Sequence, residues 1–210
     1  MRLEDVNSVV AGIPHMAPTQ AAKIYEHFRR QRPRAALELG FAHGVSSCYI
    51  AGALEETGGG HLTTIDRVSA IDRNPNIDAL LNACGLTELV TVVFADTSYT
   101  WELMRFLERT PQPRFDFVYI DGAHLWEVDG FSFLLVDRLL KIGGWVLFDD
   151  LNWTLHTSPS LKDADWVLKL PTDQRTTPQV RKVFELLVRT HDKYGEFLEE
   201  QGWGWARKTG

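Results

Sequence analysis

The sequence has few cysteines, no surplus of basic residues and no long hydrophobic run. Only Cys48 and Cys84 occur among 210 residues, which excludes a disulfide framework and fits a reducing compartment. The formal net charge of -6 argues against a nucleic-acid partner, because such proteins usually carry a basic stripe. No apolar run is long enough to span a bilayer, and the first residues lack the pattern of a signal peptide. We therefore expect a cytoplasmic protein that binds neither nucleic acid nor a membrane.

Five short apolar segments alternate with helical patterns along the first 150 residues. The expected strands are residues 35–39, 61–66, 90–94, 115–121 and 145–148. Each is the near-continuous apolar type that is buried in a parallel sheet. The expected helices between them cover residues 19–30, 76–84 and 98–109, with two more after Gly44 and Asp121. This order predicts an α/β fold with a doubly wound, mainly parallel sheet and helices on both faces.

Three further expectations concern the flanking segments and one internal helix. Residues 1–16 show no strong period, and residues 12–18 read as a loop. The helix after Asp121 is predicted to bury one apolar face and to end at two glycines. That face consists of Phe131, Leu134, Leu135, Leu139 and Ile142, and the glycines are Gly143 and Gly144. Past residue 151 we expect loops, a helix over 180–191 and a last edge strand at residues 202–208.

The most informative stretch runs from residue 34 to 50. Glu38 is an acid within a buried strand, which is costly unless the carboxylate finds donors or a cationic ligand. Gly40 and Gly44 bracket the turn that follows, and the next helix begins there, so its free N–H groups suit an anionic group. A dinucleotide-binding turn would carry glycines where this chain has Ala42 and Val45, which argues against NAD.

Acidic residues follow the expected strands at the same edge of the sheet. They are Asp66, Asp96, Asp121 and the pair Asp149 and Asp150. An acid at the position of Asp66 suits the two hydroxyls of a ribose, although it could equally cap the next helix. The last three come from neighbouring strands and could converge on a divalent cation such as Mg²⁺. The alternative is that they cap a helix and a turn.

Five segments together resemble successive motifs of the class I S-adenosylmethionine (SAM) dependent methyltransferases. They read LELGFAHGVSS, TTIDR, ADT, FVYIDGAHLWEVDG and GGWVLFDDLNW. The closest likeness is to small metal-dependent O-methyltransferases similar to the catechol, caffeoyl-CoA and macrolide-sugar enzymes. Catechol-type members carry asparagine where this chain has Asp150 and a catalytic lysine where it has His124, so the sequence is more similar to the sugar-modifying members.

The resemblance implies a role for individual residues. It implies that SAM is held at its amino-acid end by Glu38, Gly40, Gly44 and Ser46, at its ribose by Asp66 and at its adenine amine by Asp96. It also implies a metal bound by Asp121, Asp149 and Asp150, and places Asp121 among the cofactor-binding and catalytic residues. His124 follows Asp121 by three residues and could act as a general base, or it could merely cap the helix or support a metal ligand.

The expected function is therefore SAM-dependent, metal-assisted O-methylation of a small molecule with neighbouring hydroxyls. The alternatives are a metal-independent small-molecule methyltransferase and a non-catalytic SAM-binding module. We expect a single domain, with residues 1–33 as a helical cap, 34–150 as the SAM and metal core, and 151–210 as the substrate-side loop, helix and edge strands. The apolar helix over 179–191 and the aromatic tail leave room for a homodimer.

Overall fold

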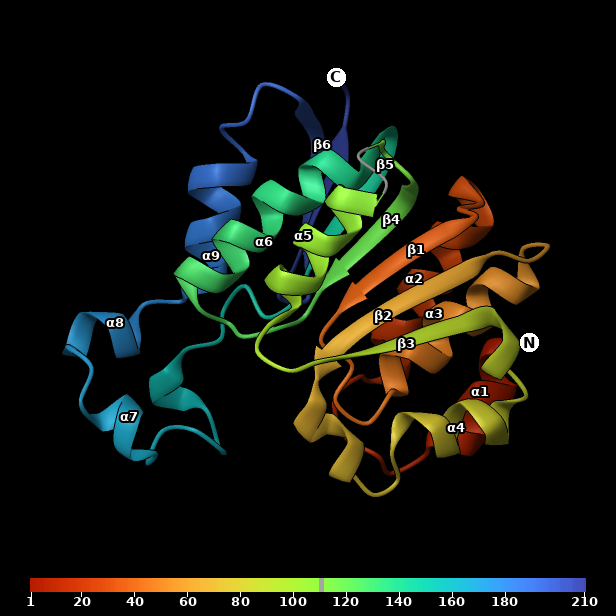
Figure 1. Cartoon of the computed structure of the whole chain (residues 1–210), viewed down its shortest axis with the longest axis horizontal. Helices are drawn as coiled ribbons and strands as arrows, with labels where there is room; N and C mark the ends of the chain where they lie inside the picture. The colour runs from red at the N-terminus through yellow and green to blue at the C-terminus, as the bar shows by residue number, and fades with distance from the viewer. Residues whose placement is uncertain (110–111) are drawn as a thin grey trace.

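One seven-stranded sheet forms the centre of the protein, which we describe from a computed structural model covering residues 1–109 and 112–210 (Figure 1). The strands are β1 (Ala35–Leu39), β2 (His61–Arg67), β3 (Val90–Ala95), β4 (Phe115–Ile120), β5 (Leu140–Phe148), β6 (Tyr194–Glu200) and β7 (Trp203–Lys208). Their order across the sheet is β3-β2-β1-β4-β5-β7-β6, and β7 runs antiparallel to both neighbours. The first five strands pair in parallel, which confirms the predicted fold class.

Helices cover both faces of the sheet and enclose two hydrophobic cores. One face carries α1 (Leu3–Val10), α2 (Pro18–Gln31), α3 (Val45–Glu56) and α4 (Ile77–Cys84), and the other carries α5 (Tyr99–Arg109), α6 (Trp126–Leu139) and α9 (Gln179–Val183) (Figure 1). The short helices α7 (Asp165–Leu168) and α8 (Thr172–Thr176) lie in a lobe beside the sheet. Within the described ranges, no helix combines the length and hydrophobicity needed to cross a lipid bilayer.

Two elements near the ends of the chain were not predicted. Helix α1 buries only Val6 and Val10, so its apolar signal is limited to two positions one turn apart. Strand β6 alternates buried and exposed positions weakly and contains three glutamates, a composition that β-strands usually avoid. Because β6 occupies the edge of the sheet, β7 is an internal strand, and the prediction that residues 202–208 form the edge was wrong.

The predicted buried face of α6 was correct at Leu139 but wrong at Phe131 and Leu134, and the predicted end of the helix was wrong. Phe131 and Leu134 are 52% and 49% exposed, whereas Phe133 is fully buried. The buried face also includes small and polar residues such as Gly130, where a Cβ atom would lie 3.2 Å from Leu187. Close helix packing therefore selected a face that hydrophobicity alone does not identify. The helix ends at Leu139, and the two expected stop glycines lie inside β5.

Candidate functional site

The carboxyl ends of the central strands meet at one edge, where Gly40 is required for their approach. Gly40 follows β1 with φ +91°, and a Cβ atom there would lie 2.0 Å from the backbone carbonyl oxygen of Asp121. The Asp121 N–H donates to Leu39 at 2.9 Å, and the Gly40 N–H donates to Ile65 at 2.8 Å. Strands β1 and β4 are neighbours, but the chain continues from β1 to β2 on one side of this pair and from β4 to β5 on the other. This is the switch point at which α/β sheets bind ligands.

The turn after β1 is shaped by a second glycine and by Asp66. Gly44 precedes α3 with φ +95°, and a Cβ atom there would lie 2.6 Å from the side chain of Ile77. The Asp66 carboxylate accepts the N–H groups of Phe41 at 3.0 Å and Ala42 at 2.7 Å. Asp66 therefore holds the turn in place from the end of β2.

Glu38 lies beneath this turn rather than in the open site. Its side chain is fully buried and accepts the hydroxyls of Thr64, at 2.6 Å, and Ser47. Its other carboxylate oxygen has no hydrogen-bond partner. Burial raises the pKa of Glu38 to about 7, against the opposing effect of the hydroxyl donors. The sequence analysis identified this residue as unusual, and the neighbouring hydroxyls are the donors that it required.

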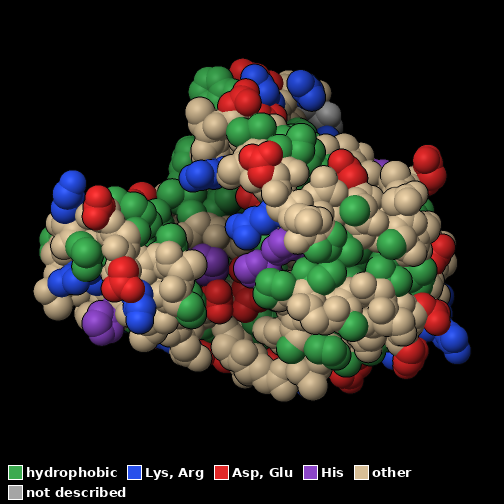
Figure 2. Space-filling model, turned by 90° about the horizontal axis from the view of Figure 1, so that it is seen from below, with side chains coloured by type: hydrophobic (Ala, Val, Ile, Leu, Met, Phe, Trp, Pro, Cys, Tyr) green, Lys and Arg blue, Asp and Glu red, His purple; other side chains and the backbone are tan. Residues whose placement is uncertain are grey.

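A cavity of about 550 Å³ opens above the glycine turn. Of the predicted cofactor residues, those that line it are Gly40, Ser46, Asp66 and Asp121, whereas those outside its lining are Glu38, Gly44 and Asp96. Further lining residues include His15, Arg73 and Tyr99. Figure 2 shows acidic, basic and histidine side chains gathered in a hollow between the main body and a smaller lobe.

Asp121, His124 and Asp150 bring their ligand atoms within 4.8 Å of one another, and Asp121 and His124 line this cavity. The Nε2 atom of His124 lies 3.3 Å from Asp121 and 3.0 Å from Asp150. Burial lowers the pKa of His124, but the two carboxylates outweigh it and raise the pKa to about 10. The carboxylates therefore favour the protonated form of the imidazole.

The geometry around His124 departs from that of an ordinary ion pair. Nε2 is buried, and neither short contact has the alignment of a hydrogen bond. His124 and Asp150 both adopt positive φ angles, 58° and 57°, which are uncommon outside glycine and cluster at functional sites. The ring of Trp153 packs 4.7 Å from the imidazole and limits its movement.

The carboxylate of Asp149, the third predicted metal ligand, meets that of Asp121 at the Tyr119 hydroxyl, which also donates to Asp121 at 3.4 Å. It accepts the Tyr119 hydroxyl and, at 2.6 Å, the N–H of Asp150. Burial and then the charges of Asp121 and Asp150 raise the pKa of Asp149 to about 7. The three acids therefore lie close enough to repel one another, as expected. The group that could bind an ion among the described residues nevertheless contains His124 in place of Asp149.

Tyr99 and Asp129 support the loop between β4 and α6, and the sequence analysis missed both. The Tyr99 hydroxyl accepts the N–H of Ala123 and donates to Asp129 at 3.2 Å, while Asp129 also accepts the N–H of Leu125 at 3.1 Å. An acid near the start of a helix is common for dipole reasons alone, so nothing in the pattern distinguished Asp129. The only available signal was that the carboxylate of Asp129 lies close in sequence to the predicted site residues Asp121 and His124.

A comparison with protein families identifies the chain. Residues 37–151, more than half of its length, match a family described as a methyltransferase domain. The chain belongs to this methyltransferase family. The prediction of a methyltransferase is thereby confirmed, and the seven-stranded sheet agrees with the predicted fold class.

Solved structures of methyltransferases share the fold. The O-methyltransferase TomG from Streptomyces achromogenes, in complex with SAM, is 19% identical with a TM-score of 0.69, covering 99% of this chain and 89% of that chain. An O-methyltransferase from Bacillus cereus with SAH is 20% identical with a TM-score of 0.70, covering 99% and 90%. A putative caffeoyl-CoA O-methyltransferase from Staphylococcus aureus is 20% identical with a TM-score of 0.70, covering 100% and 93%. The comparison with curated proteins found no match.

Proposed function

We propose that this methyltransferase transfers the methyl group of SAM to a hydroxyl oxygen of a small molecule with neighbouring hydroxyls, assisted by a divalent cation. The observation that carries the proposal is the group formed by Asp121, His124 and Asp150, of which Asp121 and His124 line the cavity above the glycine turn. Carbohydrate-like and aromatic diols both present two adjacent oxygens, which suit a cation that keeps open coordination positions.

The cofactor side of the cavity would be provided by the turn and the start of α3. Gly40 leaves room for close approach, and Ser46 offers a hydroxyl together with the first N–H groups of the helix. These groups suit the carboxylate of the amino-acid end of SAM. Bound SAM would supply an electrophilic methyl carbon, which forms a bond to the acceptor oxygen as its bond to sulfur breaks, leaving SAH. Asp66 remains the candidate for the ribose.

The residues around His124 fit a divalent cation. Two carboxylate oxygens and one imidazole nitrogen form a donor set typical of divalent-metal sites, and the unaligned, buried Nε2 has no better partner. A cation held there would orient the acceptor and lower the pKa of its hydroxyl. In the present arrangement His124 holds its own proton, and only the loss of that proton frees Nε2 to bind an ion or to accept the hydroxyl proton.

The proposal is tested by binding and turnover measured separately. Calorimetric titration with SAH should show binding with Mg²⁺ and with EDTA, because the residues proposed for SAM, Gly40, Ser46 and Asp66, are not the proposed ion ligands. Methylation of a panel of diols should stop in EDTA. The substitutions Asp150→Asn and His124→Ala should each lower metal-dependent turnover by roughly 100-fold or more, while SAH should still bind.

The control variant is Glu108→Gln, an exposed acid on α5 that does not line the cavity, which should behave as the wild type. Methylation that persists in EDTA and in the Asp150 variant would remove the metal from the mechanism. SAH binding with no turnover on any acceptor would favour a non-catalytic binding module. No SAH binding under either condition would contradict the cofactor assignment.

A further inference from the structure

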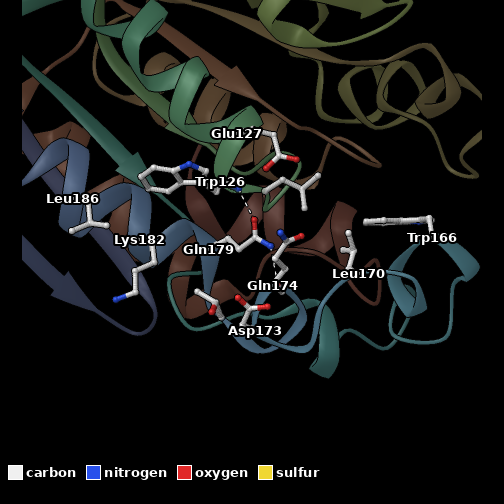
Figure 3. Close-up of a pocket in the computed structure, with 11 residues that line it drawn as sticks. Trp126, Glu127, Trp166, Leu170, Asp173, Gln174, Gln179, Lys182 and Leu186 are labelled. Atoms are coloured by element: carbon white, nitrogen blue, oxygen red, sulfur yellow. Dashed lines mark hydrogen bonds between the residues drawn. The ribbon is translucent and has the colours of Figure 1, made fainter.

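A second cavity of about 740 Å³ lies beside the proposed active site (Figure 3). It is bounded by the start of α6, by α9 and the π-helical turn Phe184–Val188 that follows it, and by the segment that carries α7 and α8. We call this second cavity the groove. Leu125 and Trp166 line both the groove and the cofactor cavity. Along the chain, His124 lines the cavity, Leu125 lines both, and Trp126 lines the groove. The two spaces therefore meet one residue away from His124.

The groove presents large apolar side chains that would ordinarily be buried. Trp126 and Trp166 are 39% and 46% exposed, and Leu170 lies beside Trp166 (Figure 3). Tryptophan binds planar apolar groups through its large flat ring, and it attracts cations through the face of that ring. A groove that carries two such rings and shares Leu125 and Trp166 with the lining of the cofactor cavity is suited to an apolar part of the acceptor.

The polar groups of the groove are largely engaged within the protein. The Gln179 side chain accepts the backbone N–H of Trp126 at 2.7 Å and donates to the backbone carbonyl of Gln174 at 2.9 Å. These two bonds tie the start of α6 to the segment after α8 (Figure 3). The groove is therefore held open by the fold, and a ligand would not have to organise it.

The charges of the groove disfavour an anion. Its charged lining residues are Glu127, Asp173 and Lys182. The ammonium of Lys182 already contacts Glu185 at 2.9 Å, which neutralises much of its charge. Two carboxylates thus face the groove without an equivalent positive charge among its lining residues. An acceptor carrying phosphate or carboxylate groups in this position would be repelled, whereas a neutral or ammonium group would not.

We infer that this groove is the recognition site for an apolar, neutral or cationic extension of the methyl acceptor. The identity of its occupant as an acceptor rests on the proposed function. The hydroxyl-bearing end would lie at His124, and the extension would pass Leu125 to reach Trp126 and Trp166. A second copy of this chain is the competing occupant, but the two lining residues shared with the cofactor cavity favour a small molecule.

The test compares four ligands that share the same two hydroxyls. Catechol, 4-phenylcatechol, 4-(2-aminoethyl)catechol and 4-(2-carboxyethyl)catechol are titrated into the protein saturated with SAH and Mg²⁺, and their methylation is measured with SAM. The phenyl and aminoethyl compounds should bind at least about 10-fold more tightly than catechol, and the carboxyethyl compound should not. Trp126→Ala should remove this advantage while the affinities for SAH and catechol stay unchanged.

Two controls separate the possible outcomes. Trp101→Ala removes a tryptophan that is more exposed than Trp126, 53% against 39%, and that lines neither cavity, so it should leave every affinity unchanged. The double change Glu127→Gln and Asp173→Asn should raise the affinity for the carboxyethyl compound. Equal binding of all four ligands, or an equal effect of Trp126→Ala on catechol and its extended forms, would overturn the inference. The inference would also be overturned if light scattering showed that the wild type is a dimer and that Trp126→Ala is a monomer.

The binding measurements remain informative if methylation is not detected. Tighter binding of the extended ligands, lost in Trp126→Ala, supports the groove even when no product forms. In that case only the proposed reaction would fail. Conversely, turnover without any preference for extended ligands would leave the reaction intact and contradict the groove.

Discussion

At the scale of single residues, Glu38 is where burial and charge conflict most directly, and the conflict predicts a pH dependence. The folded pKa of about 7 lies above the ordinary value of 4.5 because the side chain is buried. Stability from this group is therefore complete at low pH and is lost as the pH rises through about 7. The side chain in Glu38→Gln does not ionise, so this variant should gain stability relative to the wild type as the pH rises. Between about pH 5 and about pH 8, the unfolding free energy of the variant minus that of the wild type should increase by on the order of 3 kcal/mol.

Urea unfolding across this pH range measures the difference. Glu108→Gln, an exposed change on α5, is the matched control and should give a constant difference from the wild type. A parallel pair of curves for the wild type and Glu38→Gln would show that the Glu38 carboxyl does not titrate in this range.

The residues of the site differ in how far the sequence reveals them. Asp121 and Asp150 were predicted because parallel strands place their carboxyl ends at one edge, and the structure does bring them together. His124 was predicted as a base, whereas its position between two carboxylates gives it the surroundings of a ligand. Tyr99 and Asp129 could not be predicted, because their link exists only after α5 and α6 pack side by side.

At the scale of elements, α6 provides a test of which face the fold selects. Phe131 is 52% exposed, whereas Phe133, two positions away, is fully buried against Phe148 and Tyr194. Phe133→Ala should therefore lower the free energy of unfolding by about 3–5 kcal/mol, because it leaves a cavity in the core. Phe131→Ala should change it by no more than about 0.5 kcal/mol.

Chemical denaturation of the two variants makes the comparison, and each serves as the control for the other. Equal losses would mean that Phe131 is covered in solution, as a homodimer interface on this helix would require. Such a result would also show that the face predicted from hydrophobicity is buried after all.

The same elements show what a hydrophobic pattern can and cannot determine. The first four strands were predicted to within one residue of their ends because each is a short apolar run between breakers, and burial on both faces imposes that pattern. Only the second half of β5 was predicted, since this strand begins at Leu140 and contains the two glycines that were expected to stop the preceding helix. The amphipathic helix α6 was predicted in this part of the chain, but its buried face differs from the predicted one, since small residues such as Gly130 pack where two helices approach closely. Strand β6 escaped prediction because an edge strand requires little hydrophobicity.

At the scale of the whole molecule, the end of the chain supports a site built by its middle. Strand β7 pairs with β5, and the N–H of Leu151 donates to the carbonyl of Gly202 at 2.8 Å. Trp203 is 1% exposed, and its ring contacts that of Tyr119, whose hydroxyl binds the Asp149 carboxylate. A path of direct contacts therefore joins the last strand to the acids at the end of β5.

This path predicts a linked loss of stability and activity. Trp203→Ala should lower the free energy of unfolding by about 3–5 kcal/mol and should also lower the kcat of methylation at a temperature where the variant is folded, because Tyr119 and Asp149 lose their support. Trp203→Phe should recover most of both, since it refills part of the space. The exposed Trp101→Ala is the control and should affect neither. A variant that loses stability but keeps its full kcat would limit the last strand to supporting the fold, and the acids of the site would then be positioned by β4 and β5 alone.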